Sequence, residues 1–585
     1  MARATPAFAV RAAALGGAFA LALVLAGVHI DGARGDQTPG PGASALPSPQ
    51  STPAAPASGA SPAVTPTAPG PQPIYPPSPC PSGATDCSPA PEGTYMPTQP
   101  PSPAPVAVNP SSVRVLLGHG ASARLLSPPS GIVMLSGFDP NIVRAIFNPV
   151  DRTIDLLGLH TGTTQVTIQS QQGQTATLSV SVLIYAGRSD ASASINVTGH
   201  PASSQFVSEM AQVAATRATY AQPGAHITTR SADDSRRLDP DDEITVHVPV
   251  EVSGDNYFTY RANVAVHITN LAQPQLAPRV LLVSDFPETI TENGTLFYSD
   301  VTFEEPARLL YYHYAPPGAP LRRVLVKVQN AGSEASLLEM ISGISGPYTD
   351  ILGVGHSSTL RFLQHEAAGE GEVFEVPPQA TINVVDQLLP ASNLVAGLMQ
   401  MRVISGPSLR VAVVVQAADA PPTDPISDTL LSSSVRHARG IYEIPEFFYD
   451  ESYTVGDPPT TLAIGKLPLP NLVQGEVLGG DYAVKQSADV NLLNPGSSAS
   501  DVGLWFDPRG GRATGTLLIN GEIVQLHPVS PGKPALVRRF TVPAGGFTHV
   551  NVVTMPEGGS SYPVNLLFAS EPPAGAGWNL SPSVH

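Results

Sequence analysis

Few of the residues that usually carry catalysis are spaced for it in this sequence. The 14 histidines show no spacing of two to four residues, so sequence neighbours cannot form a metal triad, and only distant histidines can meet in the fold. His365 and Glu366 match the start of a zinc-binding helix, but Gly369 occupies the place of its second histidine. The segment 355–359 lacks the second glycine of a nucleophile elbow, and no helical pattern follows it. We therefore predict a non-enzymatic protein without a cofactor.

An acidic loop offers ligands for a cation. Its candidates for binding Ca²⁺ are carboxylates within one short segment, namely Asp239, Asp241, Asp242 and Glu243. The loop lacks the glycine and the terminal glutamate spacing of an EF-hand. Arginines at positions 230, 236 and 237 favour the alternative of a solvated loop held by ion pairs.

Aromatic residues gather in one expected strand. Tyr311, Tyr312 and Tyr314 are candidates for stacking against a sugar ring. Strands normally bury half of their side chains, and the chain has only 2 Trp, the residue that most favours sugar binding. Core packing is therefore the alternative reading of these tyrosines.

The two cysteines indicate the compartment. Cys80 and Cys87 lie close together, and in an exported protein such a pair oxidises to a local disulfide. Export is predicted from the N-terminus, where Arg3 and Arg11 precede the uncharged apolar run 12–28. This run fits a cleaved signal peptide or a retained signal anchor. We expect an extracytoplasmic protein that contacts the membrane only through residues 12–28, if they are retained.

Composition separates a linker from the folded part. The chain contains 63 Pro and 52 Gly, and residues 36–105 consist largely of Pro, Ala, Ser, Thr and Gly. Such a segment buries too little apolar surface to offset its ordering entropy, so a disordered Pro-rich linker is predicted. After residue 105 the pattern changes to short alternating runs such as 176–184, which are typical of strands with one buried face. One helix is predicted within 201–220.

Residues 106–187 resemble a known module. Turn signals divide the region into about seven strands, the rhythm of an immunoglobulin-like sandwich. Asp139-Pro140-Asn141-Ile142-Val143, followed by Gly162-Thr163-Thr164-Gln165-Val166-Thr167-Ile168, is similar to bacterial Ig-like (group 2) repeats and to the N-terminal domain of pilus-formation, secretin-type proteins. The resemblance implies a non-catalytic module of the cell envelope.

The C-terminal half contains an internal repeat. The segment 326–336 matches 490–500 in register, with Asn330 and Gly332 opposite Asn494 and Gly496. Each pair fits a tight turn in which the glycine supplies a positive φ. These regions resemble uncharacterised β-sandwich regions of exported bacterial proteins, some of which accompany copper amine oxidase-type domains. That enzyme's cofactor would need an acidic residue after Asn256-Tyr257, where this chain has Phe258.

The predicted fold class is mainly β, with an N-terminal signal or anchor and a disordered stalk, then an Ig-like sandwich and tandem antiparallel sandwiches with one short helix. One continuous sandwich over 190–570 is the alternative. The expected segments are 1–35 (signal or anchor), 36–105 (linker), 106–187 (Ig-like sandwich), 190–272 (strand-helix-strand unit with a hairpin), 276–418 (sandwich), 419–454 (connector), 455–572 (related sandwich) and 573–585 (tail).

Charge and architecture together define the expected function. A net charge of -17 without a basic face excludes a general nucleic-acid binder. We expect an exported envelope protein that presents sandwich modules for a structural or adhesive role, with a protein or a glycan of the cell envelope as its partner. The alternatives are a carbohydrate-binding or carbohydrate-modifying protein and an assembly factor of a pilus or secretion system.

Overall fold

The computed structural model describes residues 106–126, 133–232, 234–303, 305–421, 426–473 and 475–578. All of them belong to one unit, Pro100–His585. The predicted signal or anchor, the Pro-rich linker, the disulfide between Cys80 and Cys87 and the end of the tail lie outside the described residues.

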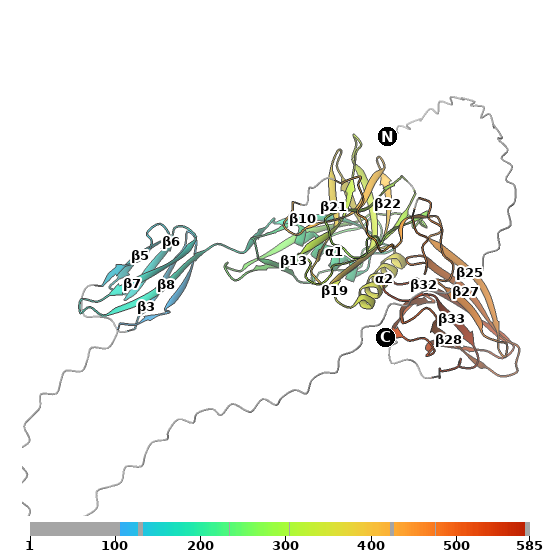
Figure 1. The fold of residues 1–585 in the computed structure, drawn as a ribbon. Helices are drawn as coiled ribbons and strands as arrows, with labels where there is room; N and C mark the ends of the chain where they lie inside the picture. Colours follow the sequence, from blue (N-terminus) through green and yellow to red (C-terminus); the bar gives the residue numbers. More distant parts are fainter. Residues whose placement is uncertain are drawn as a thin grey trace, which may run out of the picture. The chain divides into compact units, whose positions relative to one another are not determined.

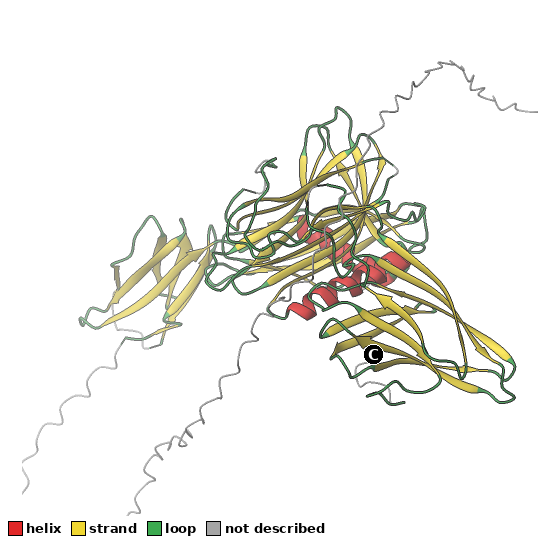
Figure 2. Cartoon of the chain, turned by 45° about the vertical axis from the view of Figure 1, so that its right-hand side comes forward, coloured by secondary structure: helices red, strands yellow, loops and turns green. Residues whose placement is uncertain are grey.

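The described chain is mainly β, as predicted (Figures 1 and 2). Strands make up several sandwich sheets, and two helices (red in Figure 2) lie among them. The prediction of one helix is therefore wrong, because the described residues form two. Helix α1 (Ser204–Arg217) confirms the helix expected within 201–220, and it begins at the N-cap Ser203, whose hydroxyl accepts from the N–H of Phe206 at 3.2 Å.

Residues 106–187 form an Ig-like sandwich of two four-stranded sheets. Alternating apolar residues such as Leu178, Val180 and Val182 point inward and are fully buried. The first sheet has the order β1 (Val108–Asn109), β3 (Gly120–Leu125), β6 (Thr153–Gly158) and β5 (Val143–Asn148). The second has the order β2 (Ser112–Leu116), β8 (Thr175–Leu183), β7 (Gly162–Gln169) and β4 (Met134–Ser136).

A ten-stranded sheet follows, and it continues across the boundary expected between 190–272 and 276–418. Its order is β12 (His226–Thr229), β13 (Glu243–Ser253), β14 (Tyr260–Asn270), β10 (Ser192–Thr198), β20 (Gly371–Val376), β19 (Ser336–Tyr348), β22 (Leu394–Ser405), β17 (Ala307–Tyr314), β15 (Val280–Ser284) and β24 (Arg439–Tyr442). The boundary is crossed where β10 pairs with β20, because Asn196 and Val373 are register partners. Helix α1 packs on β10, β13 and β14, and β9 (Gly187–Ser189) pairs with β11 (Thr219–Ala221).

Part of this sheet is covered by a second one, which completes the first large sandwich. Its order is β16 (Gly294–Val301), β23 (Leu409–Ala417), β18 (Arg322–Gln329) and β21 (Thr381–Leu389). Apolar residues of both sheets, such as Leu309, Val326 and Met399, share one fully buried core. Burial of these side chains is the main stabilising contribution to the sandwich.

The second large sandwich is formed by the C-terminal strands. One sheet has the order β25 (Glu446–Thr454), β27 (Lys485–Asn494), β32 (Gly546–Thr554), β29 (Ala513–Ile519) and β30 (Glu522–Val529). The other has the order β26 (Thr460–Ile464), β33 (Val564–Ala569), β28 (Ser500–Pro508) and β31 (Ala535–Val542). Strands β24 and β25 lie in the segment expected to be a connector, and β25 pairs in parallel with β27.

Matching strands of the two large sandwiches pair in the same way. Strands β17, β22, β19 and β20 are neighbours in that order, as are β26, β33, β28 and β31. Ser336 pairs with Val376 in the first sandwich, and Ser500 pairs with Val542 in the second. The repeated sequence segments therefore occupy equivalent positions in the two sheets.

The repeated asparagines make the same hydrogen bonds. Asn330 Nδ2 donates to the carbonyls of Glu334 and Val376, at 2.8 and 3.0 Å, and Asn494 Nδ2 donates to Ser498 and Val542, at 2.9 and 3.1 Å. Each Oδ1 accepts the N–H of the glycine two residues on. The expectation that Gly332 and Gly496 adopt a positive φ is wrong, because the asparagine side chain holds the turn.

Helix α2 (Ile351–Ala368) was not predicted from the sequence. The segment 355–359, where no helical pattern was expected, lies inside it. Asp350 caps its N-terminus by accepting from the N–H of Leu352, and Gly369 ends it with a left-handed φ of 66°. In the equivalent place of the second sandwich, between β28 and β31, the chain forms the β29–β30 hairpin. Helix α2 packs on β19 and β22 and also contacts β29.

The 2 Trp residues of the chain lie together on the second sandwich. Trp505 on β28 is fully buried, and its ring centroid is 5.2 Å from that of Trp578. Arg539 lies over the Trp578 ring, 4.6 Å from its centroid, and donates to the Trp578 carbonyl. The segment after β33 therefore packs back onto β28.

Candidate functional site

A cleft of about 430 Å³ lies between the two large sandwiches. Its walls come from strand ends and loops that are distant in the sequence. From the first sandwich and the segment before β24 they include Asp285, Glu288, Leu310, Tyr312, Ile351 and His437. From the second they include Val477, Leu478, Tyr482, Gly558, Gly559 and Ser561. Clefts between domains are preferred places for ligands because side chains from two surfaces converge there.

Three potential ligands or proton carriers meet in this cleft. Nδ1 of His437 lies 3.1 Å from Oε2 of Glu288 and 3.6 Å from Oδ2 of Asp285. Among the residues that the structure describes, these three side chains are the group that could hold a metal ion.

Strand pairing explains why the three side chains meet. Strand β15 ends at Ser284, whose register partner on β24 is Arg439. The N–H of Asp285 then donates to the carbonyl of Ala438 at 3.1 Å, which brings Asp285 beside His437. Glu288 follows three residues later, and its carbonyl accepts the N–H of Tyr314 at 2.8 Å. The backbone of Asp285 and Glu288, and of Ala438 next to His437, is therefore fixed by pairing within the ten-stranded sheet or next to it.

The environment raises the pKa of two of these groups. Burial, with the repulsion of Glu288, raises the pKa of Asp285 to about 7, although the contact with His437 opposes the shift. The hydrogen bond to Asp285 and the attraction of both carboxylates raise the pKa of His437, against the effect of burial. Groups with raised pKa values that meet in a cleft are candidates for proton transfer or cation binding, which is a frequent property of functional sites.

The structure separates the three candidate tyrosines. Tyr311 is fully buried, and its hydroxyl donates to Gln387. Tyr312 is 8% exposed and lines the cleft, where its hydroxyl donates to the carbonyl of Ile351 at 3.3 Å. Tyr314 is partly buried and packs beside the apolar cluster of Tyr312. Only Tyr312 of these three lies among the residues that line the cleft, and burial of Tyr311 counts against its contact with a ligand.

The candidate calcium ligands do not converge. Asp239 pairs with Arg237 at 3.1 Å, and Glu243 lies 3.4 Å from His267. Oδ1 of Asp241 accepts the N–H of Ala272, and Asp242 belongs to no group of close potential ligands among the described residues. These contacts match the alternative of an ion-paired loop.

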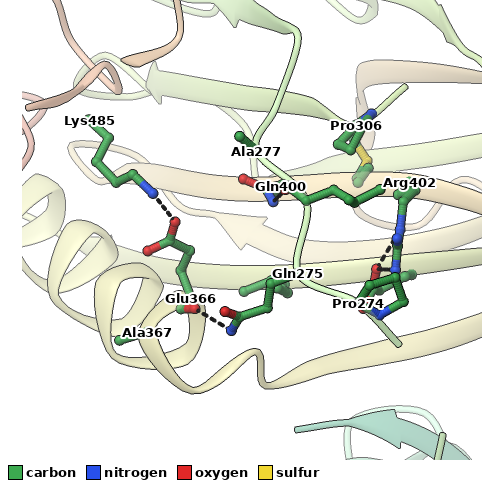
Figure 3. Close-up of a pocket in the computed structure, with 13 residues that line it drawn as sticks. Pro274, Gln275, Ala277, Pro306, Glu366, Ala367, Gln400, Arg402 and Lys485 are labelled. Atoms are coloured by element: carbon green, nitrogen blue, oxygen red, sulfur yellow. Dashed lines mark hydrogen bonds and ion pairs between the residues drawn. The ribbon is translucent and has the colours of Figure 1, made fainter. Parts of the chain in front are cut away.

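A second pocket, of about 240 Å³, has paired charges (Figure 3). Arg402 binds Glu339 with 2.6 Å between Nη2 and Oε2, and Lys485 binds Glu366 as well as Glu446, the latter at 2.9 Å. Figure 3 shows Lys485 and Glu366 pointing toward one another. Because Lys485 belongs to the second sandwich and Glu366 to α2, the pair of Lys485 and Glu366 joins the two sandwiches. The charged residues that line the pocket are two carboxylates and two cations, so their charges balance.

Asp285, Glu288 and His437 were not among the site residues predicted from the sequence. Asp285 and Glu288 stand three residues apart after an apolar run, which is a weak signal, and His437 lies in the segment expected to be a connector. A further pair was also missed, because His356 and Glu557 meet only when the two sandwiches pack together.

No protein-family model matches the chain, and no curated protein matches its sequence. Similar solved structures include the N-terminal Ig1-2 module of the Drosophila receptor protein tyrosine phosphatase DLAR, with 12% identity over 28% of this chain and 100% of that chain and a TM-score of 0.13. Another is human mucin-like protocadherin EC1-2, with 15% identity over 28% and 98% of the two chains and a TM-score of 0.13.

A third similar structure is SGBP-B from the Bacteroides ovatus mixed-linkage glucan utilization locus, in complex with a mixed-linkage heptasaccharide. It has 8% identity over 51% of this chain and 100% of that chain, with a TM-score of 0.13.

Neither helix in the described part of the chain has the length and apolar character needed to cross a bilayer.

Proposed function

We propose that this chain is an exported, non-enzymatic β-sandwich protein that binds a protein partner of the cell envelope beside the cleft between its large sandwiches. The observation that carries the proposal is the exposed apolar loop at the cleft. Leu467, Leu472, Val473 and Val477 are 60%, 54%, 48% and 57% exposed, and Val477 also lines the cleft. Several exposed apolar side chains in one short segment that reaches a cleft suit a protein interaction site.

The rest of the body suits a rigid scaffold. Its buried charges are used within the protein: Arg308 is fully buried and donates to the carbonyls of Pro445 and Ala483 and to Glu446. Since Arg308 belongs to β17, while Glu446 and Ala483 belong to the C-terminal half, these bonds hold the two sandwiches in one arrangement. A fixed arrangement lowers the entropy lost when a partner binds.

A capture experiment tests this proposal. The full chain carrying Leu472→Asp and Val473→Asp would be compared with the wild type for the proteins that it retains from envelope extracts of its source cells. We expect the variant to lose the specific partner while its thermal unfolding stays unchanged, because both side chains are exposed. Val150→Asp is the matched control, since Val150 is 86% exposed on the Ig-like sandwich. Recovery of the same proteins by the loop variant would refute the role of this loop.

A glycan partner is the second candidate, and the cleft supplies the observation that favours it. Tyr312 and Tyr482 line the same cleft as Asp285 and Glu288, and aromatic rings next to carboxylates can bind a sugar. A glycan array would show binding that Tyr482→Leu abolishes and that the loop variant leaves intact. The assembly-factor alternative rests on the Ig-like resemblance, and pilus or secretin subunits among the captured proteins would support it.

The proposed location outside the cytoplasm has its own test. Cell fractionation with mass measurement of the mature N-terminus would find the protein in the envelope or the medium. A start after the apolar run 12–28 indicates a cleaved signal peptide, and an intact Met1 in the membrane fraction indicates an anchor. An intact cytoplasmic protein would contradict export.

A further inference from the structure

We propose that Asp285, Glu288 and His437 form a binding site for one divalent transition-metal ion, for which Zn²⁺ is the probe. The proposal stands on the geometry of these residues and does not depend on the proposed protein partner. One imidazole nitrogen and two carboxylate oxygens are a donor set that zinc sites use.

The distances between the donor atoms fit one ion. Zinc lies about 2.0 to 2.2 Å from nitrogen and oxygen ligands, so two ligands at a tetrahedral angle are about 3.3 Å apart. Nδ1 of His437 is 3.1 Å from Oε2 of Glu288 and 3.6 Å from Oδ2 of Asp285. These two separations lie on either side of the tetrahedral value, and all three donor atoms lie within 4.8 Å of one another, so side-chain rotations can place a metal among them.

A second observation points to a missing ligand. Oδ1 of Asp285 is buried and has no hydrogen-bond partner, although the side chain as a whole keeps 25% of its surface exposed. An unpaired buried carboxylate oxygen is costly, and a bound cation would satisfy it. Because Asp285 lines the cleft and its side chain is partly exposed, an ion can reach the carboxylate group from solvent.

The charges around the site favour a divalent cation. Metal binding displaces the protons that these groups carry, and the resulting two carboxylates and neutral imidazole carry two negative charges, which a divalent ion balances. The arginines that flank His437 are engaged elsewhere: Arg436 pairs with Glu476 at 3.2 Å, and Arg439 donates to the carbonyls of Phe286, Leu296 and Leu431. Neither arginine is paired with Asp285 or Glu288 in the structure.

The donor set also selects the class of metal. Calcium takes about six to eight oxygen ligands, and three protein donors with an imidazole among them do not provide such a shell. Three protein ligands leave a fourth zinc position for water or for a ligand atom, and here that position faces the cleft. The site therefore resembles open zinc sites more than closed structural ones.

Equilibrium dialysis of the full chain with Zn²⁺ tests the site, in a background with Cys80→Ser and Cys87→Ser so that thiols do not bind the metal. We expect saturable binding of one ion per chain and a higher melting temperature with Zn²⁺. His437→Ala and Glu288→Gln should each weaken binding by more than about 100-fold, because each removes a direct ligand. Co²⁺ in place of Zn²⁺ should give visible absorption bands of a site with nitrogen and oxygen ligands.

The matched control is His549→Ala. His549 also lies near a carboxylate, 3.4 Å from Asp489, but the pair is exposed and belongs to no group of three potential ligands. Glu288→Gln distinguishes loss of a metal ligand from misfolding. The Glu288 side chain is 32% exposed, so the substitution should leave the melting temperature of the metal-free protein unchanged. Binding that survives both ligand substitutions, or that His549→Ala reduces equally, would overturn the proposal, as would the absence of one-to-one binding in the parent chain.

Discussion

Nδ1 of His356 donates to the carboxylate of Glu557, with 3.0 Å to Oε2 and 3.1 Å to Oε1. The pair joins helix α2 of the first large sandwich to the loop after β32 of the second. Glu557 is fully buried and also accepts from the hydroxyls of Thr514 and Thr516, while Nε2 of His356 faces Oε1 of Gln525 at 3.2 Å. Both ring nitrogens thus face acceptors, an arrangement that favours the charged imidazolium.

Removal of this histidine should destabilise the contact between the sandwiches. His356→Ala leaves the Glu557 carboxylate buried with only its threonine partners, and loss of one partner from a buried pair lowers the free energy of unfolding by about 3 kcal/mol. Chemical denaturation measures the change. His549→Ala is the control, because its pair with Asp489 is exposed and should contribute less than about 0.5 kcal/mol. Equal effects of the two substitutions would show that the buried pair has no special role.

The same pair should make stability depend on pH. Burial lowers the pKa of His356, but the hydrogen bonds and charge of Glu557 outweigh burial, and the pKa is raised above the usual 6.5. A raised pKa means that the folded state binds the proton more tightly, so the stabilisation is complete below pH 6.5 and is lost as pH rises through the folded value. The stability difference between wild type and His356→Gln, measured from about pH 6 to about pH 9, should shrink with rising pH. A difference that grows would contradict this account.

Position 355 should tolerate no side chain, because the backbone of Gly558 lies too close to it. A Cβ at this position of α2 would lie 1.7 Å from the carbonyl oxygen of Gly558, so Gly355→Ala forces the helix and the loop apart. We expect the free energy of unfolding to fall by about 1 to 3 kcal/mol, the range of overpacked cores, in denaturation experiments. Gly577→Ala is the control because a Cβ there meets no atom within 4 Å. An unchanged Gly355→Ala protein would show that α2 and the loop do not pack this closely.

The repeated asparagines should contribute equally to the stability of the two sandwiches. Asn494→Ala leaves the carbonyls of Ser498 and Val542 without their donor, at a cost of about 2 kcal/mol, and Asn330→Ala should behave alike. Asn494→Asp should cost at least as much, because a carboxylate oxygen then faces two carbonyl oxygens. Asn263→Ala, at an exposed position of β14, is the control. If Asp is tolerated better than Ala at position 494, the donor role of Nδ2 is wrong.

The sequence predicts a strand well where one of its faces is buried. It predicts secondary structure poorly where tertiary packing determines it. Alternation over 176–184 predicts β8 because a period of two needs no other information. Helix α2 was not predicted because Gly353, Gly355 and a Ser-Ser-Thr run weaken the helical pattern. Asp350 and Gly369 are typical capping residues, but each of them indicates a helix end only when the other is considered with it. The small residues are explained by the fold, since Gly355 and Ser358 lie where neighbouring backbone comes close.

The candidate site could not be predicted for a different reason. Asp285 and His437 approach each other because β15 and β24 pair at one edge of the ten-stranded sheet, and no local pattern specifies that pairing. The same holds for Tyr311 and Tyr312. Alternation along the strand predicts that the two side chains lie on opposite faces of the sheet, but it does not predict which face lines a cleft. Long-range strand pairing therefore determines the chemistry that is available between the sandwiches.

The two adjacent tryptophans give the molecule a built-in optical reporter of one part only. Since Trp505 and Trp578 both belong to the second sandwich, intrinsic tryptophan emission follows the melting of that sandwich, whereas far-ultraviolet circular dichroism follows every sheet. Coincident transitions would mean that the contacts at His356 and Lys485 make the two large sandwiches unfold as one cooperative unit. Separate transitions would mean that each sandwich melts independently, and the order of melting would show which half is the weaker.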